Sequence, residues 1–269
     1  MFKNARKNFI GLLTVSLLAA SGLVHAKDND TSAKSVLAPS GTLLVGVYSG
    51  SPTSVIEGAT PAENRGVGHD LGKLLAEKLS APFKAVIFPG NASLLNAVKK
   101  GEVDLSVTNA TSARKKFMDF SPTFMQTEKS FLVPGDSEFK SIDALTATNA
   151  TVGVSKGSTT AKTMAELFPK LQIREIDTLA HAADMLKSKE IDAFATNNAI
   201  LFQMSDSVPG SRVLPGQWDM EYFAAGIPKG RAAGLPYLRA FIIAADKDGT
   251  IANIIKRAGL RGVTPVIGK

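Results

Sequence analysis

Two motifs that carry hydroxyl and amide side chains each occur twice in this chain, in the same order. A strand-like run leads into a Gly-Ser-x-Thr loop at residues 45–53 and again at residues 152–160. A Glu-Val-Asp or Glu-Ile-Asp turn leads into a strand that ends in Thr-Asn at residues 99–109 and again at residues 187–197. Hydroxyl and amide groups donate and accept hydrogen bonds, so this chemistry suits the binding of a small polar molecule. The alternative is a chance similarity between common αβ patterns.

The sequence offers little for catalysis or metal binding. It contains no Cys, which excludes thiol nucleophiles, disulfides and iron–sulfur clusters. The two His residues beyond residue 26, His69 and His181, lack the His-Glu-x-x-His spacing of a zinc site. We therefore expect no catalytic residue, no metal and no cofactor.

Apolar spacing indicates the elements that position the repeated motifs. Helical spacing marks residues 71–79, 94–98, 161–168, 179–186, 235–245 and 251–258. Strand-like runs lie at residues 83–88, 171–176 and 222–227. Both halves therefore read β-α-β-α-β, which predicts parallel strands with helices on both faces of each sheet. Ligands of such sheets bind beyond the carboxyl ends of the strands, so we expect a cleft between two lobes. The polar residues expected to line it are Ser51, Asn109, Ser158 and Asn197.

The first residues of the chain have the pattern of a secretory signal. Three basic residues in the first seven precede an apolar run at residues 9–24, and the small residue Ala26 follows. This pattern predicts a signal peptide at residues 1–26, cleaved near Ala26. The alternative is a membrane anchor, but the run is shorter than the roughly 20 residues that span a bilayer. The polar residues 27–39 are typical of a flexible lead-in.

The positive charge of the chain shrinks once this segment is removed. The 31 Lys and Arg residues against 24 Asp and Glu give a formal net charge of +7. Cleavage removes three positive charges, so the mature charge is 7 − 3 = +4. Acidic side chains are mixed among the basic ones, which predicts no nucleic-acid partner.

Several further motifs occur in a characteristic order along the mature chain. Residues 66–71 read Gly-Val-Gly-His-Asp-Leu, and a Thr-Ser-Ala-Arg motif ends at Arg114. The other motifs are residues 101–104, 119–122, 132–133, 152–154, 157–159 and 191–193. Together they resemble family 3 solute-binding proteins, the periplasmic receptors of polar amino acid ABC importers, and residues 66–71 resemble that family's Gly-Phe-Asp-x-Asp-Leu start. The resemblance covers most of residues 42–260.

This resemblance implies an α/β, type II periplasmic-binding-protein-like fold in which two doubly wound lobes, joined by two hinge crossings, close over a solute. We expect lobe 1 to comprise residues 40–132 and 219–269, and lobe 2 to comprise residues 133–218. The hinges are expected near residues 131–134 and 215–219.

The resemblance also assigns ligand-binding roles to individual residues. Arg114 matches the family arginine that clamps the ligand's α-carboxylate, and a guanidinium fits a carboxylate through two parallel hydrogen bonds. Asn109 and Thr111 match positions that hydrogen-bond the ligand. Ser158 and Thr159 match a loop whose backbone N–H groups bind an anion at a helix start. The alternatives are a solvated Arg114 and simple helix capping by the two hydroxyl residues.

Aromatic side chains near the predicted site have two alternative roles, contact with the ligand or packing in the core. Tyr48 supplies an aromatic ring from the first loop or else packs in the core. Asn91 stands near the place where the family often has an aromatic residue. The lone Trp218, near the second hinge, is expected to be a packing residue.

Asn197 departs from the family pattern, which has an Asp that pairs with the ligand's α-ammonium group. An amide accepts a hydrogen bond without the charge-assisted part. Either the ligand lacks an α-amino group, or another carboxylate such as Glu57 or Glu221 supplies the charge, or Asn197 caps a helix and the ligand is still an amino acid. We expect Asn197→Asp to strengthen amino acid binding relative to the binding of plain carboxylates.

These features predict a monomeric periplasmic protein that captures a small, polar, carboxylate-bearing solute for an ABC importer. Its expected partners are this solute and the permease in the inner membrane. One alternative is a periplasmic enzyme on the same fold, similar to cyclohexadienyl dehydratase. The other is a module that presents its ligand to a membrane sensor.

Overall fold

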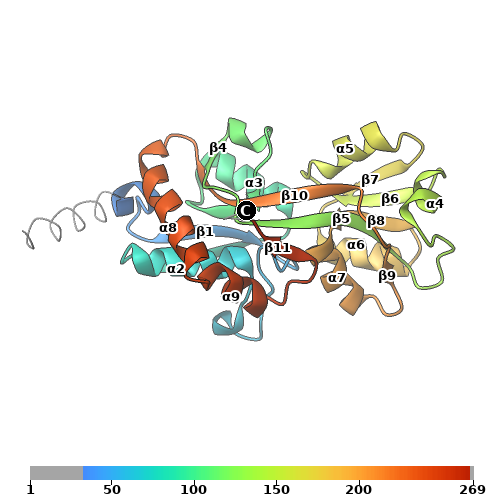
Figure 1. The fold of residues 1–269 in the computed structure, drawn as a ribbon, viewed down its shortest axis with the longest axis horizontal. Coiled ribbons are helices and arrows are strands. Elements are labelled where there is room, and N and C mark those ends of the chain that lie inside the picture. The colour runs from blue at the N-terminus through green and yellow to red at the C-terminus, as the bar shows by residue number, and fades with distance from the viewer. Residues whose placement is uncertain (1–32, 267–269) are drawn as a thin grey trace, which may run out of the picture.

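The structure is a computed structural model that describes residues 33–266. The predicted signal peptide, its cleavage site near Ala26 and the first part of the lead-in lie outside the described residues. The expectation of a flexible lead-in is wrong for its described part, because residues 33–37 are helical and Leu37 is buried in the core of the first lobe. Two lobes lie side by side along the long axis of the molecule, and long strands connect them (Figure 1). The predicted α/β fold, with two doubly wound lobes and two crossings between them, is confirmed.

The first lobe contains the first predicted β-α-β-α-β unit. Its elements are β1 (Leu43–Tyr48), α2 (Val67–Lys78), β2 (Phe83–Phe88), α3 (Asn91–Lys100) and β3 (Ser106–Asn109). β1 and β2 pair in parallel, with Val45 opposite Ala85. On its other edge, Val45 forms a parallel bridge to Leu105, directly before β3. The helix α3 ends at Gly101, whose left-handed φ of +70° favours a residue without a Cβ atom.

The second lobe repeats this unit. Its elements are β6 (Thr151–Ser155), α5 (Thr160–Leu167), β7 (Gln172–Ile176), α6 (Leu179–Lys187) and β8 (Ala193–Asn197). β6 pairs in parallel with β7 on one side and with β8 on the other. The central strand of each lobe is therefore the first strand of its unit.

The aspartate of each repeated turn has the same structural role. Asp104 Oδ2 accepts a hydrogen bond of 2.8 Å from the backbone N–H of Leu44 in β1. Asp192 Oδ2 accepts an equal bond of 2.8 Å from Thr151 in β6. The backbone N–H groups of the two aspartates in turn donate to the carbonyls of Leu44 and Thr151. Each turn is thus fastened to the start of the central strand, which explains the conserved spacing between the two halves of this chain.

Two long antiparallel strands carry the chain between the lobes. They are β5 (Met125–Val133) and β10 (Asp219–Pro228), and they make one sheet of order β3-β10-β5-β8-β6-β7. The first half of β5 pairs with β10 and the C-terminal strand, whereas Lys129 to Leu132 pair with β8 of the second lobe. The first crossing therefore lies before Lys129. We expected it near residues 131–134, but Phe131 and Leu132 already pack in the second lobe.

The remaining elements are short or lie at the periphery. They are η1 (Pro61–Glu63), η2 (Arg114–Lys116), β4 (Met118–Phe120), α4 (Ile142–Thr146), α7 (Asn198–Ser207), β9 (Arg212–Val213), η3 (Ala232–Gly234), α8 (Leu235–Lys247), α9 (Thr250–Arg257) and β11 (Val263–Pro265). Within residues 33–266, no helix is long and apolar enough to cross a membrane.

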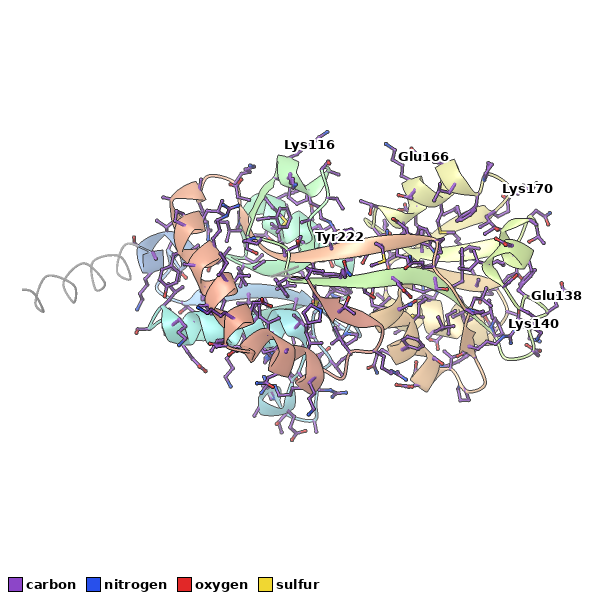
Figure 2. All side chains as sticks on the ribbon, viewed as in Figure 1. Lys116, Glu138, Lys140, Glu166, Lys170 and Tyr222 are labelled. Atoms are coloured by element: carbon purple, nitrogen blue, oxygen red, sulfur yellow. The ribbon has the colours of Figure 1, made fainter. Side chains whose placement is uncertain are left out.

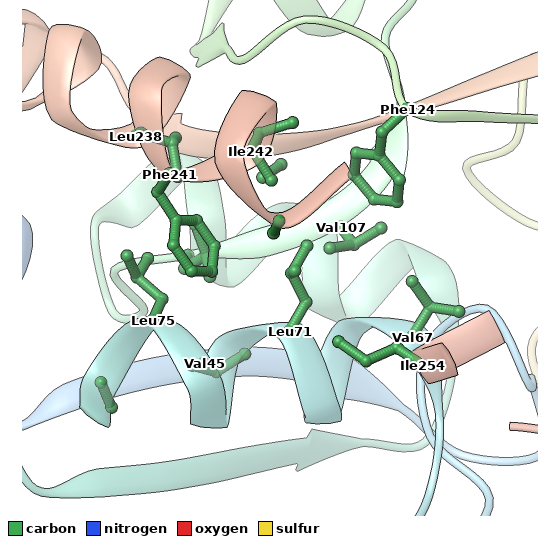
Figure 3. Close-up of a cluster of buried hydrophobic side chains, with 14 of the residues drawn as sticks. Val45, Val67, Leu71, Leu75, Val107, Phe124, Leu238, Phe241, Ile242 and Ile254 are labelled. Carbon is green, nitrogen blue, oxygen red and sulfur yellow. The ribbon is translucent and has the colours of Figure 1, made fainter. Parts of the chain in front are cut away.

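Each lobe has its own hydrophobic core. In the first lobe, Leu71 and Leu75 of α2 face Leu238 and Ile242 of α8 (Figure 3). This contact explains why the tail of the chain returns to the first lobe. In the second lobe, one cluster packs α6 and α7 against the sheet, and a second cluster packs α5 against its other face. Burial of this apolar surface holds each lobe together without a covalent link.

Candidate ligand-binding site

A small cavity of about 30 Å³ lies between the lobes, beyond the carboxyl ends of the central strands. Its lining comes from both lobes and from β10. The residues that line it are Tyr48, Thr53, Asn91, Val107, Thr108, Asn109, Arg114, Ser155, Ser158, Thr196, Asn197, Ile200, Glu221 and Phe223. The predicted site residues among them are Tyr48, Asn109, Arg114, Ser158 and Asn197.

Arg114 reaches the cavity from η2 and is only 7% exposed. Its Nη1 donates to Thr108 Oγ1 at 2.6 Å and to the carbonyl oxygen of Asn109 at 3.2 Å. These are the hydrogen bonds that the guanidinium makes within the described residues, and they leave Nη2 and Nε available to a ligand. Burial lowers the pKa of Arg114, while the charge of Glu221 opposes this shift. A buried guanidinium still carries its charge, so this side chain can bind an anion.

Asn197 is held at both ends of its amide. Its Oδ1 accepts from the backbone N–H of Ile200 at 3.2 Å, which caps the start of α7. Its Nδ2 donates to Glu221 Oε2 at 2.9 Å. Asn197 therefore caps a helix and also fixes a carboxylate in the cavity.

Glu221 supplies the negative charge that Asn197 lacks. It lies on β10 and is 8% exposed, whereas the neighbouring Tyr222, labelled in Figure 2, is 45% exposed and does not line the cavity. Its Oε1 lies 3.6 Å from the Nζ of Lys129. A carboxylate can accept about four hydrogen bonds, so Glu221 can accept another donor from a ligand.

Tyr48 combines the two roles that its sequence position left open. It lines the cavity, and it also packs against apolar clusters of both lobes. Burial raises the pKa of its phenol, although a hydrogen bond with Ser51 opposes this shift. The phenol is therefore neutral at pH 7 and can donate a hydrogen bond.

Three predicted site residues lie outside the cavity lining. Ser51 is buried behind Tyr48, and its Oγ lies 2.9 Å from Thr53 Oγ1. Thr111 Oγ1 accepts from the backbone N–H of Arg114 at 3.3 Å, which supports the turn that carries the guanidinium. Thr159 is the N-cap residue of α5, without a side-chain capping bond, and lines an outer groove.

Among the predicted site residues, Ser158 has a side-chain hydroxyl whose hydrogen-bonding capacity is unused within the described residues. Its Oγ is buried and has no hydrogen-bond partner in the described part of the chain. Buried hydroxyl groups are nearly always paired. Because Ser158 lines the cavity, a ligand atom is a suitable partner.

The two lobes touch around the cavity, so the cleft is closed. Asn91 Nδ2 donates to the carbonyl of Lys156 in the second lobe at 3.4 Å. A Cβ atom on Gly90 would lie 2.1 Å from the carbonyl oxygen of Asp177, and one on Gly157 would lie 3.1 Å from Ala92 Cα. Glycine at these positions permits close contact of the lobes.

The fold brings several residues to the cavity that were not among the site residues predicted from the sequence. Glu221 was one of two candidate carboxylates; the other, Glu57, binds the hydroxyl of Ser49 and does not line the cavity. The alternation of buried Glu221, exposed Tyr222 and buried Phe223 along a strand is a signal for its inward position. Ser155 was also missed, although residues 153–157 spell the Gly-x-Ser-x-Gly sequence of a hydrolase nucleophile elbow.

This serine lacks the partners that such an elbow needs. No His is among the residues that line the cavity, so the Ser-His pair of a hydrolase is not formed there; the carboxylate in the lining is that of Glu221. Within residues 33–266, no group of three or more His, Cys, Asp or Glu side chains could hold a metal ion. The polar groups that line the cavity can make hydrogen bonds and charge pairs with a small molecule.

Comparison with known proteins agrees with this geometry. Two relatives are glutamine-binding proteins. GlnH of Bacillus subtilis, named as an ABC transporter protein, is 26% identical over 260 residues, which cover 92% of this chain and 94% of GlnH. The protein of Geobacillus stearothermophilus is 29% identical over 239 residues, which cover 82% of this chain and 90% of that protein. The solved structure of a solute receptor for L-cysteine from Neisseria gonorrhoeae has the same fold, with a TM-score of 0.74, 24% identity and coverage of 85% of this chain and 93% of the receptor. The model of the bacterial extracellular solute-binding proteins, family 3, matches residues 43–260. With its two lobes, its closed cleft and a match over most of its length, the chain belongs to the family 3 solute-binding proteins.

Proposed function

We propose that this protein is the periplasmic substrate-binding component of an ABC importer, and that it captures a small α-amino acid or a related carboxylate. The observation that carries the proposal is the pairing of Arg114 and Glu221 in one closed cavity. One group is positive and the other negative, and each has unused hydrogen-bonding capacity. An α-amino acid presents the complementary pair of charges.

Arg114 is the proposed carboxylate clamp. The unoccupied edge of its guanidinium, formed by Nη2 and Nε, matches two carboxylate oxygens. Ser158 Oγ, which has no partner within the described residues, would add a neutral donor from the second lobe. Ligand contacts from both lobes would add to the direct contacts between the lobes in the closed state, which is how a solute drives closure.

Glu221 is the proposed partner of the ammonium group. Asn197 and Lys129 hold its two oxygens, so the carboxylate is already oriented when the ligand arrives. This arrangement favours an amino acid over a plain organic acid, because a plain acid would leave Glu221 without its added donor. In this proposal, Glu221 supplies the negative charge that the neutral Asn197 lacks.

The importer role is supported by the relatives. One of them is named as an ABC transporter glutamine-binding protein, and we infer a permease in the inner membrane as the partner of this chain. The proposed periplasmic location is supported by the membership of an extracellular solute-binding family and by the signal-peptide pattern at residues 1–26. A sensor-presenting role would use the same site; binding of the loaded protein to permease vesicles, rather than to a sensor domain, distinguishes the two roles.

A thermal-shift screen followed by calorimetry tests the proposal. The mature chain is incubated with L-amino acids and with the matching acids that lack the amino group. We expect an amino acid to raise the melting temperature through preferential binding to the folded state, and its deaminated analogue to bind at least tenfold more weakly. Tighter binding of the analogue would contradict the role of Glu221. Disappearance of the bound compound with release of a product would indicate the alternative, an enzyme.

A further inference from the structure

A buried lysine lies directly behind the cavity. Lys129, on the crossing strand β5, is 1% exposed. Its Nζ lies 3.1 Å from Asp219 Oδ2 and 3.6 Å from Glu221 Oε1, and 5.1 Å from the centre of the Trp218 ring. An ammonium group is costly to bury unless it is paired, and these three contacts are its compensation.

Lys129 balances the second acidic group beside the cavity. Arg114 and Glu221 line the cavity with one charge of each sign. Behind them, Lys129 and Asp219 add another pair. The sum of these four groups is zero. Without Lys129, the same cluster would carry one net negative charge beside the ligand.

A neutral cluster has a consequence for selectivity. Charges interact strongly in a closed site, because few water molecules screen them. A ligand whose own net charge is zero therefore meets no net attraction or repulsion. A ligand with an additional cationic side chain would have to bind near Lys129 and Arg114 with only one accessible carboxylate in the cavity lining.

We propose that Lys129 is a specificity-determining residue that selects net-neutral amino acids against cationic ones. Its positive charge compensates one of the two negative charges that Asp219 and Glu221 carry. The inference rests on the proposed function of the site. Lys129 does not line the cavity, so it acts through Glu221 as a positioning residue. Its effect is on which ligand is preferred, in addition to any effect on how tightly ligands bind.

Variants of two residues test this role by setting the charge of the cluster. Lys129→Met makes the cluster net negative, Asp219→Asn makes it net positive, and the double variant returns it to neutral. The probes are L-glutamine, L-arginine and L-glutamate, measured by calorimetry at pH 8. We expect Lys129→Met to raise the affinity for L-arginine relative to L-glutamine by roughly tenfold, and Asp219→Asn to shift preference towards L-glutamate.

The double variant Lys129→Met/Asp219→Asn is the matched control. It lacks the ammonium group but keeps the net charge, so we expect the wild-type preference to return. Lys129→Arg should keep that preference too. A purely structural role would weaken all three probes equally and leave their ratios unchanged, and that result would overturn the inference.

Two further results distinguish a failure of this inference from a failure of the proposed function. If wild-type protein binds no amino acid, the proposed function fails. If wild-type protein binds and the ratios in Asp219→Asn stay at wild-type values, the role of Lys129 fails alone. Asp219 has a side chain that is 39% exposed, so its Asn variant is expected to fold even where Lys129→Met does not.

Discussion

The Nδ2 atom of Asn197 donates a 2.9 Å hydrogen bond to Oε2 of Glu221, and so joins the start of α7 in the second lobe to the crossing strand β10. The amide stands at the position for which the family resemblance implies an aspartate, and the acid lies beside it. The negative charge of the site thus comes from Glu221, on a strand that links the lobes. Consequences of this and of other contacts can be measured.

Asn197→Asp should weaken amino acid binding, which reverses the expectation from the sequence. The new carboxylate would lie against Glu221, and two such groups cannot both ionise without repulsion, so one pKa rises. We expect about a tenfold loss of affinity at pH 7 in calorimetry, with partial recovery at pH 5. The double variant Asn197→Asp/Glu221→Gln exchanges the acid and the amide and should restore binding. Equal affinities for the single variant and wild-type protein would contradict this account.

Arg114→Ala should abolish ligand binding while the protein remains folded. The variant loses a charge-assisted contact of two parallel hydrogen bonds, which should lower the affinity by at least about 100-fold. Arg114→Lys keeps the charge but not the fork, so an intermediate loss is expected from titration calorimetry. Circular dichroism checks the fold, and a small drop in melting temperature is expected because Thr108 and the Asn109 carbonyl lose their donor. Wild-type affinity in Arg114→Ala would refute the clamp.

Gly90→Ala should impede closure of the cleft. Gly90 has an extended backbone, with φ −163°, which any residue adopts without strain. The added methyl group would lie 2.1 Å from the Asp177 carbonyl oxygen of the other lobe. We expect affinity to fall by more than about tenfold, because the bound state would need a wider cleft. Small-angle scattering should show a smaller ligand-induced compaction than in wild-type protein, with an unchanged melting temperature of the free protein. Full compaction would show that the lobes accommodate the methyl group.

The two repeated aspartates offer a matched pair for stability measurements. Asp104→Ala should cost about 2–4 kcal/mol, because it removes a buried bond to Leu44 and leaves Arg231 without this partner. Asp192→Ala should cost only about 1 kcal/mol, since the equivalent bond to Thr151 is exposed. Urea unfolding gives both values. Equal losses would mean that burial and the Arg231 contact add nothing.

Asp70 should make the free energy of unfolding depend on pH. Burial alone would raise the pKa of this carboxyl, but hydrogen bonds from His69 and Arg257 outweigh it and lower the pKa. A carboxyl with a lowered folded pKa contributes stability above its unfolded value of about 3.9, and this contribution is lost as pH falls through the folded value. Asp70→Asn should therefore be less stable than wild-type protein at pH 7, with a difference that shrinks below about pH 4. Urea titrations at pH 7, 5 and 3 check this, and a constant difference would contradict it.

The sequence alone determined the local elements and their order. Apolar spacing predicted both β-α-β-α-β units, because the periodicity of buried side chains is a property of each helix and strand by itself. The repeated turns and loops predicted that Asn109, Ser158 and Asn197 meet at strand ends, since parallel strands bring their carboxyl ends to one edge. These contacts follow from local geometry and one rule of topology.

Only the tertiary structure decided which charges share the cavity. Glu221 and Lys129 lie 92 residues apart (221 − 129 = 92) on the two crossing strands, and their meeting depends on the register of β10 against β5. A shift of one residue would turn Glu221 outward and Tyr222 inward, so no local pattern fixes it. The same holds for Gly90 and Asp177, which touch because two separately folded lobes close on each other.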